Sequence, residues 1–69
     1  MTASEIKQTL KSAGLHLTIE RDATSGHEFV VETADGQIIA YGWSGGTKNE
    51  AAQEALRHPA IQLKLRAVG

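Results

Sequence analysis

Hydrophobic residues recur at two different spacings along the chain, and each change of spacing separates a helix from a strand. Between Ala3 and Ala13 they return every three or four positions, which predicts a short one-sided helix. Thr2 and Glu5 have the spacing of a capping box at its start, and Gly14 suits a left-handed C-cap. The first element is therefore expected to be a helix that begins after Thr2 and ends before Gly14.

The middle of the chain alternates hydrophobic and polar residues with a period of two. This pattern predicts half-buried strands over residues 15–20, 27–33 and 37–43. Residues 21–26 are polar and contain glycine, so a loop is expected between the first two strands. Asp35-Gly36 is a strong hairpin signal between the other two. Together these segments predict an antiparallel sheet of three strands.

A two-residue turn at Asp35-Gly36 would decide which side chains face the core. Counting outward from it gives the pairs Thr33–Ile38, Val31–Ala40 and Phe29–Gly42 on one face. The opposite face then carries Glu28, Val30, Glu32, Ile39, Tyr41 and Trp43. Because carboxylates are costly to bury, this second face is expected to be the outer one. The core is expected to receive Phe29, Val31, Ile38 and Ala40.

A second helix is predicted after the glycine turn at residues 44–46. Thr47 and Glu50 repeat the capping-box spacing directly before an alanine-rich stretch, so this helix is expected to start at about Lys48. Pro59 disfavours helical geometry at the residue before it, which places the helix end near Arg57.

The C-terminal tail fits two patterns. Ile61, Leu63 and Leu65 alternate with polar residues, as in an extended strand, whereas Leu56, Ala60, Leu63 and Ala67 would fit a helical stripe. We favour the extended segment. The predicted fold class is thus α+β, a two-layer sandwich of order α-β-β-β-α with a possible extra strand.

Composition narrows the possible functions. The chain has 69 residues, no cysteine, and seven basic against eight acidic residues, for a formal charge of -1. One domain over residues 1–69 is expected. A dedicated nucleic-acid binder usually has a marked positive excess, and a disulfide framework or thiolate metal site needs cysteine. Without an apolar run long enough for a signal peptide or a membrane span, we expect a cytoplasmic domain with no membrane partner.

No constellation of residues points to catalysis. His16, His27 and His58 fall in three separate elements, so no pair has metal-ligand spacing. Glu28 and Glu32 lie on one exposed strand without a cleft that would make them an acid–base pair. We expect no enzymatic activity, no metal site and no cofactor.

The outer sheet face is the predicted interaction patch, with Val30, Ile39, Tyr41 and Trp43 as its members. Exposed aromatic residues on a sheet can bind a protein, mediate self-association or stack bases. Glu20, Glu28 and Glu32 would repel phosphates, so base stacking is disfavoured. A protein-interaction or self-association domain is the leading hypothesis. Alternatively, the tail folds back over the patch, or Trp43 turns into the core.

The glycine turn before the second helix has two interpretations. Free amides at a helix start, together with Lys48, could hold a phosphate. Alternatively, Thr47 and Glu50 satisfy those amides as helix caps, which we favour. The order of residues does not match a phosphate-binding P-loop.

The segment from Gly42 to Ala52, the tripeptide Ser25-Gly26-His27 and the order of elements resemble the double-stranded RNA-binding domain. The resemblance implies RNA contacts from Gln8 on the first helix, His27 in the loop and Lys48 at the second helix. Such domains bind the shape of an RNA duplex. Of the family's three basic positions on the second helix, this chain matches only Lys48. Double-stranded RNA binding is therefore the alternative hypothesis.

The middle of the chain also resembles small bacterial YegP-like domains. The similarity lies in the hairpin around Asp35-Gly36, from Glu28 to Ala40, and in Lys48 at the following helix. It implies no particular function.

Overall fold

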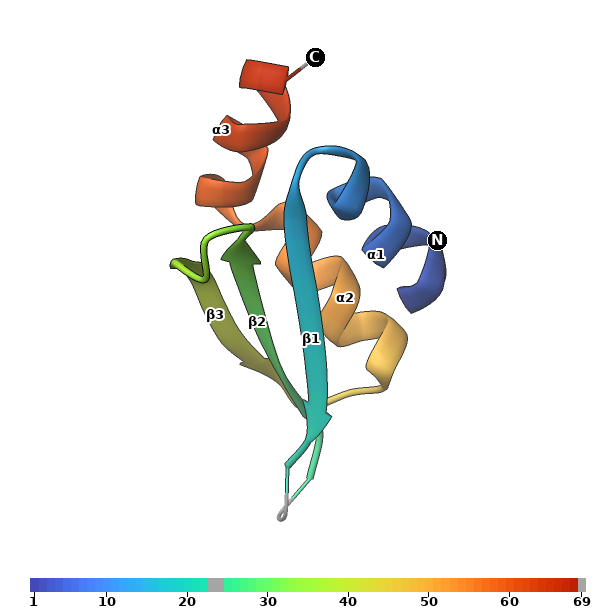
Figure 1. Cartoon of the computed structure of the whole chain (residues 1–69). Coiled ribbons are helices and arrows are strands. Elements are labelled where there is room, and N and C mark those ends of the chain that lie inside the picture. Colours follow the sequence, from blue (N-terminus) through green and yellow to red (C-terminus); the bar gives the residue numbers. More distant parts are fainter. Residues whose placement is uncertain (23–24, 69) are drawn as a thin grey trace.

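The computed structural model describes residues 1–22 and 25–68 and has the order helix, three strands, two helices (Figure 1). The elements are α1 (Ala3–Ser12), β1 (Leu15–Arg21), β2 (His27–Thr33), β3 (Ile38–Ser44), α2 (Lys48–Arg57) and α3 (Pro59–Val68). The antiparallel sheet has the strand order β1-β2-β3. The predicted α+β fold is therefore confirmed; of the predicted loop between β1 and β2, residues 23–24 lie outside the described residues.

Both predicted capping boxes are present. In α1 the Glu5 amide donates to the Thr2 hydroxyl over 3.3 Å, and the Thr2 amide donates to the Glu5 carboxylate over 2.8 Å. In α2 the amides of Glu50 and Thr47 make the same reciprocal bonds, each at 3.3 Å. Each box satisfies amides that a helix start leaves free, so local sequence fixes where both helices begin.

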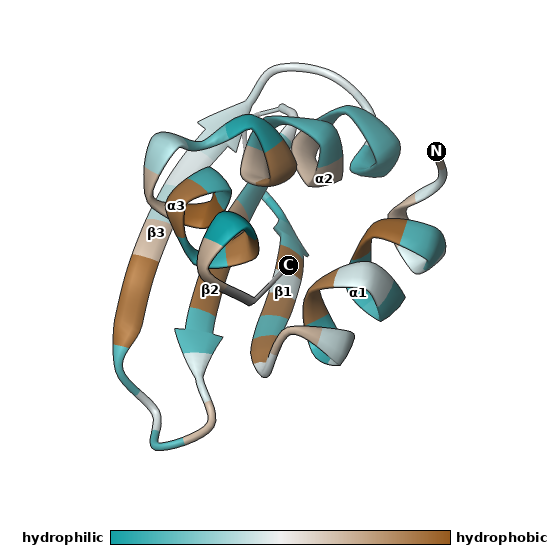
Figure 2. Cartoon of the chain, turned by 90° about the horizontal axis from the view of Figure 1, so that it is seen from above, coloured by the Kyte–Doolittle hydropathy of each residue, from teal (hydrophilic) through white to brown (hydrophobic). Residues whose placement is uncertain are grey.

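The core lies between the sheet and the helices. Along β1 every second residue turns inward, so that Leu15 and Leu17 are buried and His16 is exposed. The colouring of β1 shows hydrophobic and hydrophilic residues in alternating bands (Figure 2). The largest fully buried side chains of the core are those of Ile6, Leu10, Val31 and Ile61, and Phe29 also belongs to it. Small alanines line the buried side of α2, which lets this helix contact α1 and all three strands.

The β2–β3 hairpin differs from the predicted two-residue turn. The Gly36 amide donates to the Thr33 carbonyl over 3.0 Å, and the Thr33 amide donates to the Gln37 carbonyl over 2.9 Å. Residues 34–36 therefore form a three-residue loop, with Gly36 at φ +87° in the left-handed region that glycine adopts most easily.

A bulge in β3 beyond this loop brings the two strands back to the predicted register. Ile38 pairs with Glu32, but Ala40 pairs with Val31, so that Ile39 is an extra residue in the ladder. The expected Thr33–Ile38 pair is wrong, and so are the predicted orientations of both isoleucines. Ile38 is 57% exposed on the outer face, whereas Ile39 packs against the core. Beyond the bulge, Val31–Ala40 and Phe29–Gly42 pair as predicted.

The tail is a helix, and the expected extended segment is wrong. His58 has the extended backbone that a following proline favours, which ends α2 at Arg57 as predicted. Pro59 then begins a new helix, because the first position of a helix needs no amide donor. Ile61 is buried and Leu65 half-buried, one turn apart, while Leu63 is 64% exposed. Helix α3 contacts α2 and β3 at the hairpin end of the sheet (Figure 1).

Candidate interaction surface

The outer face of the sheet is a grid of nine side chains in three rows. Strand pairing gives the rows His16–Glu32–Ile38, Thr18–Val30–Tyr41 and Glu20–Glu28–Trp43, each written from β1 to β3. The column on β3 is apolar or aromatic. The other two columns are polar and acidic apart from Val30. The face therefore has an apolar side along β3 and an acidic side along β1 and β2.

Tyr41 and Trp43 are exposed, as the sequence analysis predicted for this face. The Tyr41 side chain is 76% exposed and that of Trp43 is 52% exposed. The Trp43 indole N–H donates to the Ser25 carbonyl over 3.1 Å, and the ring lies against Gly45. These contacts within the chain hold the indole in one orientation.

The predicted patch of Val30, Ile39, Tyr41 and Trp43 needs one correction. Ile39 leaves the face through the bulge, and Ile38 takes its place beside Glu32. The hairpin signal Asp35-Gly36 allows turns of more than one length, so this exchange of isoleucines could not be predicted from it.

The carboxylates of Glu20, Glu28 and Glu32 surround Val30. These four residues, with Thr18 and Ile38, line an open depression of about 240 Å³. Within residues 1–22 and 25–68, no hydrogen bond or ion pair engages the three carboxylates. Glu20 and Glu28 stand directly opposite each other on neighbouring strands. No lysine or arginine occupies any of the nine grid positions.

The sequence left open that the C-terminal tail covers the patch or that Trp43 turns into the core, and the structure shows neither arrangement. The tail packs as α3 in the helical layer, against α2 and β3, and leaves Tyr41 and Trp43 exposed. Trp43 also remains on the outer face and does not enter the core.

The start of α2 is occupied by the chain's own carboxylate. Glu50 accepts from the Thr47 amide, and its carboxylate lies directly against Gly46. A phosphate at this helix start would have to displace Glu50. This geometry supports the capping interpretation over a phosphate site.

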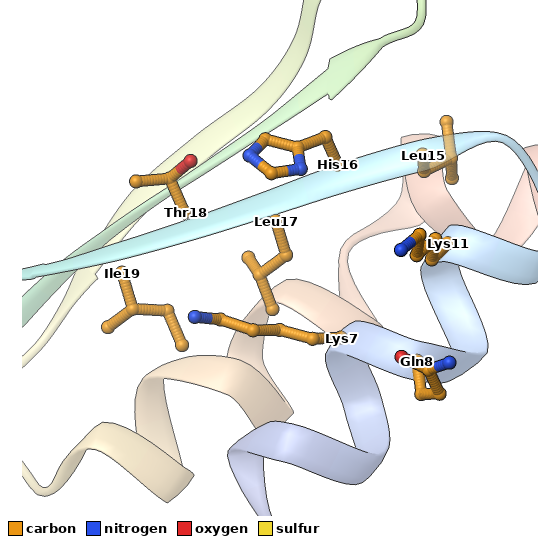
Figure 3. A pocket seen from close by; sticks show the side chains of 8 residues that line it. All are labelled: Lys7, Gln8, Lys11, Leu15, His16, Leu17, Thr18 and Ile19. Carbon is orange, nitrogen blue, oxygen red and sulfur yellow. The ribbon is translucent and has the colours of Figure 1, made fainter.

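The three residues implied by the RNA-binding resemblance lie on different elements. His27 is half-buried, and its Nδ1 lies 3.1 Å from the Gly46 carbonyl oxygen, so the beginning of β2 is next to the turn before α2. Lys48 is the exposed first residue of α2. Gln8 is exposed on α1 and lines a groove beside β1, together with Lys7 and Lys11 (Figure 3).

This groove, of about 360 Å³, runs between α1 and the free edge of β1. The half-buried Lys7 reaches along it toward Ile19, while His16 and Thr18 point to the opposite side of β1 (Figure 3). Lysine beside an edge strand is a common protection against unwanted strand pairing. The groove therefore needs no ligand to explain it.

No metal-binding cluster is found in the part of the chain that the structure describes. This part contains no group of three His, Asp or Glu side chains able to hold a metal ion. None of its helices has the length and apolar character needed to cross a membrane.

Comparison with known proteins gives no relative. No protein-family profile matches the chain, and neither curated proteins nor solved structures give a significant match.

Proposed function

We propose that this domain is a non-catalytic protein-interaction module that binds through the outer face of its sheet. The observation that carries the proposal is the β3 column, in which Ile38, Tyr41 and Trp43 are 57%, 76% and 52% exposed side by side. A small domain needs its apolar side chains for its own core, so such a column exposed to water favours a binding role.

A double substitution tests this function. Tyr41→Ser with Trp43→Ser should abolish partner capture, or any self-association seen by sedimentation, and leave the circular dichroism spectrum unchanged. Leu63→Ser is the matched control, since Leu63 is equally exposed but lies on α3, away from the sheet face. Unchanged capture and unchanged oligomeric state in the folded double variant would contradict the proposal.

Double-stranded RNA binding is a second candidate, favoured by the hydrogen-bond distance between His27 and the turn before α2. That contact brings two of the three regions implied by the resemblance together. An RNA duplex of about 16 base pairs should then cause salt-sensitive amide shifts at Gln8, His27 and Lys48. Shifts that Lys48→Glu does not reduce, or that salt does not weaken, would count against RNA binding.

A further inference from the structure

The charges of this protein are divided between its two layers. The strands and their connecting segments carry one basic residue, Arg21, and the acidic residues Glu20, Asp22, Glu28, Glu32 and Asp35. The helices carry the acidic residues Glu5, Glu50 and Glu54 and the basic residues Lys7, Lys11, Lys48, Arg57, Lys64 and Arg66. The net charge of the chain is therefore close to zero although the sheet layer is acidic and the helical layer is basic.

We infer that the partner of the outer face is an extended basic segment of another protein, with arginine or lysine two positions on either side of an apolar residue. The inference rests on the proposed function and specifies its partner. Along β2, Glu28, Val30 and Glu32 point to the same side at every second position, so the Cα atoms of the two glutamates lie about 13 Å apart with the valine between them. An extended segment has the same repeat, and its residues i, i+2 and i+4 would meet Glu28, Val30 and Glu32.

The neighbouring columns favour the same occupant. Glu20 stands beside Glu28 on one side and Trp43 stands beside it on the other. A guanidinium group in this row would have two carboxylates and an indole ring within reach, which combines ion pairing with a cation–π contact. Tyr41, next to Val30, extends the apolar surface for the central residue.

A second copy of the chain fits this face poorly. If two copies met through it, the carboxylates of Glu20, Glu28 and Glu32 from both would converge without a lysine or arginine among the grid positions. A nucleic acid would meet the same repulsion from its phosphates. A basic partner is the occupant that complements both the charge and the apolar column.

A synthetic peptide tests the inference on the whole protein. The probe is a Ser/Thr peptide with arginine at positions one and five and leucine at position three. One control peptide has glutamate in place of both arginines. A second control has the two arginines next to each other, which removes their spacing. The single tryptophan, Trp43, reports binding by its fluorescence. We expect the probe to shift Trp43 emission and the amides of β2 and β3, with weaker binding as salt is raised.

Variants locate the contact. Glu28→Gln with Glu32→Gln should weaken binding of the probe about tenfold at low salt. Glu5→Gln, which removes one negative charge from α1 on the far side of the sheet, should leave binding unchanged. Tyr41→Ser is the second variant, because this residue is so exposed that its replacement should not affect folding. It should also weaken binding.

Three outcomes would overturn the inference. They are equal binding of the arginine and glutamate peptides, no change in the double carboxylate variant, and concentration-dependent dimerisation that Tyr41→Ser abolishes. Suppose that the double carboxylate variant binds normally, or that the protein dimerises through Tyr41, while the Tyr41/Trp43 variant loses capture. The outer face would then still bind a protein, as proposed, but the partner would not be a basic segment. Preserved capture in that variant would instead remove the proposed function itself.

Discussion

Gly26 and Gly36 both have positive φ angles, +78° and +87°, but their surroundings differ. A Cβ on Gly36 would meet nothing within 4 Å, whereas one on Gly26 would overlap the Ser44 carbonyl oxygen. We expect Gly36→Ala to cost about 1 kcal/mol from backbone strain alone. Gly26→Ala should cost more than about 2 kcal/mol, because strand β3 must also move. Urea unfolding of both variants measures the difference, and equal losses would contradict it.

Glu5 contributes to stability in a pH-dependent way. Hydrogen bonds from the Thr2 backbone amide, then from its hydroxyl, hold the pKa of Glu5 below its ordinary value of 4.5. Because the folded-state pKa is lowered, the ionised carboxylate stabilises the fold above pH 4.5, and this contribution disappears as pH falls through the folded-state value. Glu5→Gln keeps a capping side chain without the charge. We therefore expect the stability difference between wild type and variant to shrink on acidification.

Urea midpoints at several pH values measure this loss. A carbon-13 titration of the Glu5 carboxyl gives the pKa directly, with the urea-unfolded chain as its control. The prediction fails if Glu5 titrates at the same pH in both states.

At the scale of elements, the bulge in β3 makes adjacent isoleucines unequal. Ile39 packs against the core, so Ile39→Thr should destabilise the protein by about 2 kcal/mol. Ile38 is 57% exposed, and Ile38→Thr should change stability by no more than about 0.5 kcal/mol. Threonine retains a high strand propensity at both sites, so thermal or urea unfolding compares burial alone. If Ile38→Thr cost more stability than Ile39→Thr, the regular hairpin expected from the sequence, without the bulge, would be correct.

Another pair of substitutions tests whether the C-terminal tail is the helix α3 or an extended segment. In a strand, Ile61, Leu63 and Leu65 would share one face, whereas in the helix Ile61 is fully buried and Leu63 points to water. Ile61→Ala should therefore cost about 3 kcal/mol and Leu63→Ala less than about 0.5 kcal/mol. Similar costs at the two positions would favour the extended tail.

At the scale of the whole molecule, the features predicted correctly depend on residues close together in sequence. The capping residues Thr2 and Thr47 set both helix starts, and the alternation along β1 and β2 assigned their inner and outer faces. The same local signals identified Tyr41 and Trp43 as exposed.

The features predicted wrongly depend on contacts between distant segments. Ile39 turns inward at the end of the sheet where α3 contacts β3, and α3 itself is stabilised by burying Ile61 and Leu65 in a core built by other elements. Its own sequence fits a strand and a helix about equally well. Tertiary packing decides between such alternatives.

Glu20 and Glu28, which lie directly opposite each other on β1 and β2, affect stability and the proposed binding in opposite directions. Like charges directly opposite on neighbouring strands repel, so this pair lowers the stability of the folded state. Glu28→Gln should raise stability by about 0.3 kcal/mol at low salt while it weakens binding. Glu32→Gln, whose strand neighbours are His16 and Ile38, should weaken binding without that gain. If urea midpoints show this difference, selection for stability alone would remove Glu28 from the outer face and, with it, part of the proposed binding site.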